Sequence, residues 1–499
     1  MPQRPIGRAT LLPIAIDRRA RPGLQRQVYE QVRDGILAGR VAPGTRLPAT
    51  RELARDIGVS RNTVVGAFEQ LLAEGYVRGA VGSGTYVAEL TPDALLNARL
   101  PSEAAPPIAA VARRRGLSER GHRIAGIHQP GRLPASGAFV LGPAVDLFPS
   151  AEWARLLARV WRRPEPAMMQ YGDPAGDPPL RRAIADYLRE VRALRCTPDQ
   201  VIVVAGAQQG IDLAARVLTD VGDAALVEEP GYAGIRGALT AAGARLVPTP
   251  VDAEGLDIRY GEAAAPDARL ACVAAARQYP LGMTMSLARR LALLHWAERR
   301  DAWIIEDDYD SEYRYGGQPV AALQGLDRTG RVIYVGSFSK VMFPSLRLGY
   351  LVVPRDLAEP IVRARAVLDA HPSAVTQLAL AHFIDDGSFA AHIRRMRRLY
   401  AARQAALLAA AKRHWSGLLT VPPSESGMHL LATIDAAASR HIGDREIARR
   451  AGALGIMVQP LSAYYEGSAE RQGLVLGFAA VAEEQMDQAA QALAAAITG

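Results

Sequence analysis

Apolar residues recur at helical spacing near the start of the chain. One helical face, ending before Gly39, is made by Leu24, Val28, Val32, Ile36 and Leu37. A short helix is expected over residues 50–57, and Ser60 is a suitable N-cap for a third helix. The apolar stripe of that third helix is Val64, Phe68, Leu71 and Leu72. Two strand-like segments, 76–78 and 85–87, then flank the glycine-rich run 79–84, and this arrangement predicts a β-hairpin.

From Phe139 onward the pattern changes to strands and helices in alternation. Short apolar runs of strand composition occur at 201–204, 224–228, 246–248, 270–274 and 303–305. Helical patterns lie between them or precede them, for example at 150–161 and 286–300. This alternation predicts an α/β domain over residues 139–499.

Residues 89–138 follow neither pattern. Prolines 101, 106, 107, 130 and 134 are scattered there among Ala, Gly and Arg. We expect a partly extended linker, with one short helix near 109–115, between an N-terminal domain (14–88) and the α/β domain. The basic run 113–115 in this linker is either a solvated surface or a segment that approaches DNA phosphates.

Positive charge is concentrated at the N-terminal end of the chain. Of the net charge of +8, residues 1–88 supply +6, from 13 Arg, no Lys and seven acids. Three helices followed by a hairpin are the plan of a winged helix-turn-helix, whose third helix enters the DNA major groove with its N-terminal end. A basic domain of this plan predicts a nucleic-acid partner. A charged protein-interaction domain is the alternative.

The residues expected to contact DNA lie at that helix end, in the supporting helix and turn, and at the hairpin tip. Arginine suits guanine edges, asparagine suits adenine edges or phosphates, and a tip of small residues can approach the backbone closely. The candidates are Arg46, Arg51, Ser60, Arg61, Asn62, Thr63, Gly82, Ser83 and Gly84.

Lysine is almost absent from this chain. Of 59 basic residues only Lys340 and Lys412 are lysines, and the other 57 are arginines. A primary amine can lose its proton and form a Schiff base with an aldehyde, whereas a guanidinium cannot. Serines precede Lys340 and Arg347 follows it, and such groups suit a phosphate. An aldehyde together with a phosphate indicates pyridoxal 5′-phosphate as the cofactor. The alternative is a surface lysine, which is the interpretation we prefer for Lys412.

The predicted strand 303–305 runs into four acids spread over residues 306–310. Side chains two apart in an extended chain point the same way, so Asp307 and Tyr309 should share a face. Asp307 could then reach the pyridine nitrogen, which keeps the ring an electron sink, and Tyr309 the adjacent ring oxygen. A metal site is the competing interpretation, but the acids alternate in direction and no histidine lies nearby, so we expect no metal.

Two stretches carry a resemblance to a known regulator family. Residues 43–54, reading PGTRLPATRELA, and 58–64, reading GVSRNTV, resemble the GntR family of bacterial regulators. The resemblance covers about residues 20–88. It implies that Arg51, Arg61 and a wing glycine, Gly82 or Gly84, contact operator DNA.

The order of motifs in the rest of the chain resembles the fold-type I aminotransferases. It is closest to the MocR subfamily of GntR regulators, which joins a winged helix to an aminotransferase-like domain. The motifs are YGDPAG at 171–176, GAQQ at 206–209, EPGY at 229–232, EDDYDSEY at 306–313, GSFSK at 336–340 and PLSAYY at 460–465.

This resemblance implies a set of roles around the cofactor. Lys340 would hold the aldehyde, Asp307 the ring nitrogen and Tyr309 the ring oxygen. Tyr232 would stack on the ring. The phosphate cradle would consist of Ala207, Gln208, Ser337, Ser339 and Arg347. Tyr171 would reach the phosphate of a partner subunit, which implies a homodimer.

Two positions depart from the aminotransferase pattern. The arginine that often clamps a substrate carboxylate is replaced by Val475, in the run Leu-Val-Leu-Gly-Phe. Arg277 stands before Gln-Tyr-Pro, where the family commonly has histidine. It either substitutes for the clamp or faces solvent. Both departures argue against ordinary α-amino-acid transamination.

We therefore predict a transcription regulator rather than an enzyme. Its aminotransferase-like domain would sense an amino compound, or pyridoxal phosphate itself, through aldimine exchange at Lys340. A working aminotransferase with an accessory DNA-binding domain is the alternative, and a regulator without the cofactor is a third hypothesis. Two cysteines and the lack of a long apolar run favour a cytoplasmic, nucleoid-associated protein with no membrane partner.

Overall fold

The computed structural model describes residues 13–80, 84–89, 116–127, 137–316, 321–439 and 442–499. The chain divides into two compact units, 1–115 and 116–499. The helix expected near 109–115 and the basic run 113–115 lie outside the described residues.

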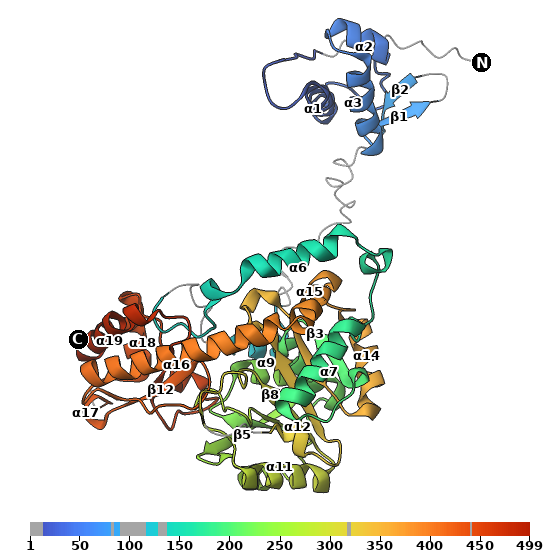
Figure 1. Cartoon of the computed structure of the whole chain (residues 1–499). Coiled ribbons are helices and arrows are strands. Elements are labelled where there is room, and N and C mark those ends of the chain that lie inside the picture. Colours follow the sequence, from blue (N-terminus) through green and yellow to red (C-terminus); the bar gives the residue numbers. More distant parts are fainter. Residues whose placement is uncertain (1–12, 81–83, 90–115, 128–136, 317–320, 440–441) are drawn as a thin grey trace, which may run out of the picture. The chain divides into compact units, whose positions relative to one another are not determined.

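The first unit has the predicted three helices and hairpin (Figure 1). Its elements are α1 (Leu24–Leu37), α2 (Thr50–Asp56), α3 (Arg61–Ala73), β1 (Val77–Ala80) and β2 (Gly84–Val87). Their apolar faces form one core, with Val28, Val32, Val64 and Leu71 fully buried. Leu37 and Leu72, expected on the inner faces, are instead about half exposed (43% and 50%), because each lies at the edge of its helix stripe near the helix end.

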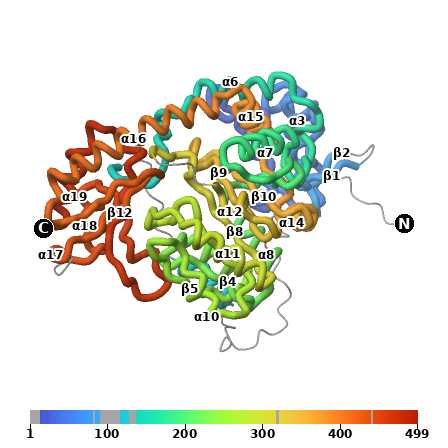
Figure 2. Tube along the Cα trace, turned by 60° about the horizontal axis from the view of Figure 1, so that its bottom comes forward, coloured from blue at the N-terminus to red at the C-terminus, as the bar shows by residue number. Residues whose placement is uncertain are grey.

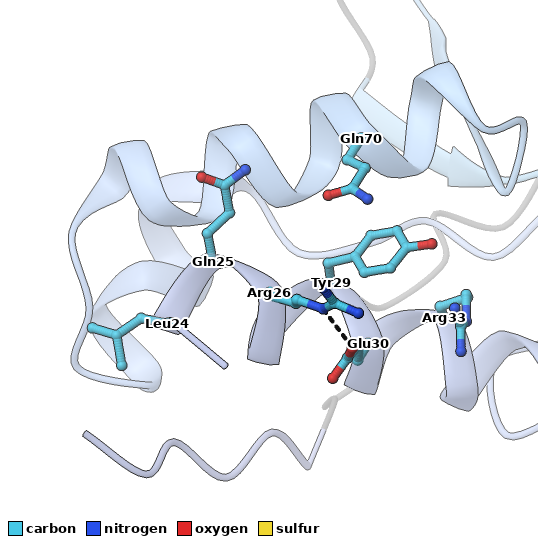
Figure 3. Close-up of a pocket in the computed structure, with 8 residues that line it drawn as sticks. Leu24, Gln25, Arg26, Tyr29, Glu30, Arg33 and Gln70 are labelled. Carbon is cyan, nitrogen blue, oxygen red and sulfur yellow. Dashed lines mark hydrogen bonds and ion pairs between the residues drawn. The ribbon is translucent and has the colours of Figure 1, made fainter. Parts of the chain in front are cut away.

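Polar contacts between α1 and α3 surround a shallow groove, shown in Figure 3. The Tyr29 hydroxyl donates a hydrogen bond to Glu74, just beyond the end of α3. The Arg33 guanidinium lies 5.6 Å from the centroid of the Tyr29 ring, and Arg26 pairs with Glu30 at 2.8 Å. The Tyr29–Glu74 hydrogen bond therefore joins α1 to the end of α3, the helix that carries the predicted DNA-reading end, while the other two contacts lie within α1.

The second unit is built on an eight-stranded sheet in the order β3-β10-β9-β8-β7-β4-β5-β6. Neighbouring strands are parallel except at β10 and β6. The strands are β3 (Val201–Val204), β4 (Ala224–Glu229), β5 (Arg245–Asp252), β6 (Gly255–Leu256), β7 (Leu270–Val273), β8 (Trp303–Asp308), β9 (Val332–Ser337) and β10 (Gly349–Val352). The central strands are buried over most of their length, as continuous apolar runs in a parallel sheet require.

Helices cover both faces of this sheet, and two separate apolar clusters lie in the layers between them. The helices are α8 (Ala207–Leu218), α9 (Ala233–Ala242), α10 (Ile258–Ala264), α11 (Leu287–Arg300), α12 (Leu323–Leu326), α13 (Phe338–Val341) and α14 (Arg355–Leu368). Three more helices form a layer on the β3 side: α7 (Pro178–Arg192) packs against β3, and α15 (Ala374–Asp385) packs against both α7 and α6 (Ser150–Arg162). Helix α5 (Glu119–Gly126), within the predicted linker, packs against α9.

A smaller antiparallel sheet, in the order β11-β12-β14-β13, forms the C-terminal part of this unit. Its strands are β11 (Leu419–Thr420), β12 (His429–Ile434), β13 (Gln459–Pro460) and β14 (Gly473–Gly477). It is covered by α18 (Asp444–Ala453) and α19 (Glu483–Thr498), and the short α17 (Ala436–Ser439) follows β12 along the chain. The 27-residue helix α16 (Ser388–His414) runs from α15 to this part (Figure 2). In the ranges described, no helix is long and apolar enough to cross a membrane.

Candidate functional site

The carboxyl ends of the parallel strands meet at one edge of the large sheet, where open α/β sheets bind ligands. A cavity of about 180 Å³ opens there. It is lined by nine of the ten residues predicted for the cofactor: Ala207, Gln208, Tyr232, Asp307, Tyr309, Ser337, Ser339, Lys340 and Arg347. The tenth, Tyr171, lies outside this cavity and its side chain is 92% exposed.

Lys340 is held at the cavity by α13, which follows β9 directly. Burial lowers the pKa of its amine, although the nearby carboxylates of Asp310 and Asp307 oppose this shift. A lowered pKa increases the fraction of neutral amine, which is the form that attacks an aldehyde. Lys412, in contrast, is exposed near the end of α16.

The four acids at the end of β8 and just after it have different surroundings. Glu306 accepts backbone N–H groups at the start of α12. Asp308 forms a buried ion pair with Arg192 at 2.6 Å and accepts the Tyr334 hydroxyl. Asp307 faces the cavity, and its Oδ1 is buried with no hydrogen-bond partner among the described residues. Burial, with Asp308 and Asp310 close by, raises the pKa of Asp307 to about 7.

The opposite end of the cavity is suited to an anion. Gly206 has φ +96° and caps α8, whose N-terminal N–H groups are the usual binding site for a phosphate. A Cβ at Gly206 would lie 3.2 Å from a terminal nitrogen of Arg347, so only glycine leaves the guanidinium its place. Gln208 donates to the Gly234 carbonyl at 2.8 Å, and the Ser339 hydroxyl is buried without a partner in the described part of the chain.

These groups fit a phosphorylated pyridine aldehyde. An amine lies at one point of the cavity, an unpartnered buried carboxylate at another, and an arginine with a helix N-terminus at a third. Bound pyridoxal phosphate would supply an electrophilic carbon and an electron-accepting ring. Among the described residues no cluster of three His, Cys, Asp or Glu side chains is arranged to hold a metal ion.

A group of aromatic rings closes one side of the cavity around Tyr279. Its ring meets those of Tyr232, Tyr309, His429 and Tyr464 edge to face, at centroid distances of 5.2–6.1 Å. The Tyr279 and Tyr464 hydroxyls are hydrogen-bonded at 2.8 Å. No sequence pattern pointed to His429, which follows a glycine turn and reaches the cavity only through tertiary packing.

Of the two sequence hypotheses for Arg277, the one that places it in solvent is wrong, and a role as carboxylate clamp stays a prediction. The residue does not face solvent, since it is only 2% exposed. Its guanidinium is hydrogen-bonded within the protein. It donates to the Tyr309 hydroxyl at 3.1 Å and to the ring and carbonyl of His429 at 3.0 and 2.6 Å. Asp310 lies 3.5 Å away as its counter-ion. Arg277 therefore ties β12 to the segment after β8.

The residues predicted to contact DNA lie on the surface of the first unit. Arg46, Arg51, Arg61 and Asn62 are exposed. Ser60 caps α3 by accepting the Thr63 N–H at 3.1 Å, and the hydroxyls of these two residues are 2.8 Å apart. Gly84 has φ +112°, and a Cβ there would lie 2.9 Å from Arg46 Nε. Gly82 and Ser83 lie outside the described residues.

Family models match both units of the chain. The model "Bacterial regulatory proteins, gntR family" matches residues 24–87, and "Aminotransferase class I and II" matches residues 145–493. A structural neighbour is LysN, the α-aminoadipate aminotransferase of Thermus thermophilus in complex with N-(5′-phosphopyridoxyl)-L-leucine. It is 27% identical, with a TM-score of 0.68, over 76% of this chain and 97% of LysN.

Curated relatives match this chain over nearly its whole length. The "Probable rhizopine catabolism regulatory protein MocR" of Rhizobium meliloti is 44% identical over 97% of this chain and 95% of its own length. The "HTH-type pyridoxine biosynthesis transcriptional regulator PdxR" of Corynebacterium glutamicum is 32% identical over 95% and 96%. The chain therefore belongs to the MocR-type GntR transcription regulators, and pyridoxal 5′-phosphate is the cofactor of its aminotransferase-like domain.

Proposed function

We propose that this regulator binds an amino-compound effector by exchange at Lys340 and that this exchange changes its affinity for operator DNA. The observation that carries the proposal is the cavity itself. It brings an amine of lowered pKa and an unpartnered buried carboxylate together, in a chain that also carries a winged helix.

Each cavity residue has a proposed role that its surroundings support. Lys340 holds the aldehyde carbon until the effector amine displaces it. Asp307 accepts the ring N–H, and Tyr309 donates to the ring oxygen, because Arg277 already donates to the Tyr309 oxygen and leaves the hydroxyl proton free. Tyr232 stacks on the ring. The phosphate is bound by Ala207, Gln208, Ser337, Ser339 and Arg347.

The first unit is proposed to read operator DNA with the end of α3. Arg51, Arg61 and Asn62 would meet base edges or phosphates, with Arg46 and the tip residues 82–84 against the backbone. Ser60 and Thr63 hold the helix end in place through the cap. We further propose a homodimer, in which the exposed Tyr171 completes the partner's phosphate site, acting in the bacterial cytoplasm.

A second candidate effector is pyridoxal phosphate itself. The PdxR relative is named as a regulator of pyridoxine biosynthesis, and it matches nearly the whole chain. In that case cofactor loading alone would change DNA affinity, with no need for an added amine.

We propose that the domain turns over amino acids poorly, if at all. Proton transfer at Cα requires the substrate to be held in alignment, and Val475 offers no charge for this. The test is a transaminase assay of the full-length, cofactor-loaded protein with a panel of amino donors and keto acceptors. Spectral change on adding an amine without sustained turnover supports the regulator. Turnover on the order of 1–1,000 per second would support the enzyme instead.

A further inference from the structure

We propose that the effector is a primary amine that carries no carboxylate beside its amino group. This inference rests on the proposed function, since it names the class of compound that exchanges at Lys340. It follows from how the positive charges around the cavity are used.

The missing clamp is not replaced by Arg277. A guanidinium has five N–H groups, and four of those of Arg277 go to the Ser426 carbonyl, the Tyr309 hydroxyl and the ring and carbonyl of His429. Asp310, 3.5 Å away and 1% exposed at its side chain, balances the charge. Freeing this guanidinium for a ligand would leave the Asp310 carboxylate buried without its partner, which is strongly unfavourable.

The position of the expected clamp is also closed. Val475 is fully buried in β14, opposite Leu431 of β12 and Gln459 of β13. An aliphatic side chain there cannot pair with an anion. The strand that often presents an arginine to a substrate carboxylate presents only a packed core residue here.

The remaining cationic groups that line the cavity are occupied or uncharged. Arg347 lies against Gly206 at the phosphate end, and Lys340 is the reacting amine. Burial beside Arg277 holds the pKa of His429 well below its usual range, so its ring is neutral. Leu141, Met428 and Tyr279 also line the cavity, and the Tyr279 ring centroid lies 5.2 Å from that of His429. This wall would accept an apolar or hydroxylated amine at less cost than a carboxylate.

The carboxyl groups of the site add to this preference. Asp307 and Glu228 line the cavity, and the Asp307 Oδ1 is buried with no hydrogen-bond partner among the described residues. An effector carboxylate would add a further acidic group beside them, and the described lining residues offer no cation beyond Lys340 and Arg347 to offset it. A neutral substituent would not.

The exchange itself balances without another reactant. The effector nitrogen forms its bond to the aldehyde carbon as the bond from Lys340 Nζ to that carbon breaks. The two protons of the effector amino group pass to Nζ, and no electrons are gained or lost. A carboxylate on the effector therefore has no part in the bond chemistry and matters only for binding.

Matched pairs of compounds test the inference directly. The full-length, cofactor-loaded protein is titrated with serine against ethanolamine and with tyrosine against tyramine, and the visible absorption is followed. We expect half-saturation by each amine at a concentration at least tenfold lower than by its amino acid. A response to the amino acid as strong as to the amine, or to neither compound, overturns the inference while the cofactor band remains. Absence of any cofactor band would overturn the proposed function as well.

Two variants sharpen this test. In Arg277→Lys the ratio of the half-saturating concentrations of amino acid and amine should stay within threefold of the wild-type ratio. The reason is that the Arg277 guanidinium is hydrogen-bonded to other residues of the protein and not to the ligand. Selective loss of amino-acid binding in this variant would contradict the proposal. Val475→Arg should improve amino-acid binding at least tenfold relative to Val475→Leu if it folds. If Val475→Arg does not fold, the ratios measured for wild-type and Arg277→Lys protein still test the inference.

Discussion

The cavity of the second unit and the α3 end of the first unit hold polar groups in opposite ways. In the cavity, Asp307 and Ser339 are buried, and each has a polar atom without a protein partner in the described ranges. At the end of α3, Arg61 and Asn62 are exposed to water. A buried polar group without a partner raises the free energy of the folded protein until a ligand forms a hydrogen bond with it. An exposed polar group is hydrogen-bonded to water and changes the stability of the free protein little.

This difference predicts two kinds of mutational effect. A cavity substitution should abolish cofactor attachment or change the stability of the second unit. A substitution at the DNA-reading surface should cost binding energy in increments and leave folding unaffected. Substitutions at both places test this difference.

The largest effect is expected at Lys340. Lys340→Ala should abolish the pyridoxyl label fixed by borohydride, because no other described lysine lines the cavity. The labelled peptide is identified by mass spectrometry. Lys412→Ala is the matched control and should keep the full label, since this lysine is exposed on α16. A label retained on Lys340→Ala protein, or one found at Lys412, would contradict attachment of the cofactor at Lys340.

Asp307 should destabilise the cofactor-free protein as the pH rises. Its pKa is about 7 in the folded state against an ordinary value of 3.8, so folding binds a proton between these values. The contribution of Asp307 to the free energy of unfolding is fully present at low pH and is lost as the pH rises through 7. The free energy of unfolding of Asp307→Asn, relative to that of wild type, should therefore increase by roughly 1–3 kcal/mol as the pH is raised from 5 to 8.

Chemical unfolding of cofactor-free protein measures this gain. All five tryptophans lie in the second unit, at positions 153, 161, 296, 303 and 415, so their fluorescence reports on that unit. Asp308→Asn is the control and should lose stability, because it leaves Arg192 buried without its ion-pair partner. An Asp307→Asn gain that is the same at pH 5 and pH 8 would rule out this pKa as its source.

Incremental losses are expected at the DNA-reading surface. Arg61→Ala and Arg51→Ala should each weaken specific binding by roughly 1–3 kcal/mol, with binding that falls steeply with salt. Arg55→Ala, on the same helix as Arg51, is the control for charge alone and should change specificity little. Quantitative gel-shift titrations at two salt concentrations measure both effects. Equal losses in Arg55→Ala and Arg61→Ala would mean that only net charge matters.

The smallest effect is expected at Tyr171. As a hydrogen-bond donor to a partner's phosphate, it should contribute about 1 kcal/mol to cofactor affinity, so Tyr171→Phe should weaken affinity several-fold. Sedimentation of the loaded wild-type protein should show a dimer. A monomer with full cofactor affinity would contradict a site shared between subunits.

Much of the fold follows from patterns that local physics enforces. The apolar stripes of α1 and α3 and the continuous runs of the parallel strands correspond to buried faces, which is why the sequence located them. The edges of helix stripes were less certain, since Leu37 and Leu72 are apolar yet half exposed. Periodicity places a residue on a face but does not say how far the neighbouring element extends over it.

The site was predictable where chemistry alone restricted the residue. The rarity of lysine singled out Lys340, and alternation along a strand separated Asp307 from Asp308. Arg277 and His429 could not be interpreted in this way, because 152 positions separate them and only packing of β12 beside the large sheet joins them. Contacts between segments so distant leave no local pattern.

Linkage between the two units is tested most directly by DNA affinity. A fragment is selected from a random-sequence pool by the full-length loaded protein. Its Kd is then measured with and without saturating ethanolamine or tyramine, whichever gives the larger spectral change. We expect the amine to change the Kd of wild-type protein at least fivefold, in either direction, and to leave the Kd of Lys340→Ala protein unchanged. An unchanged wild-type Kd, or an equal change in Lys340→Ala, would contradict regulation through this cavity.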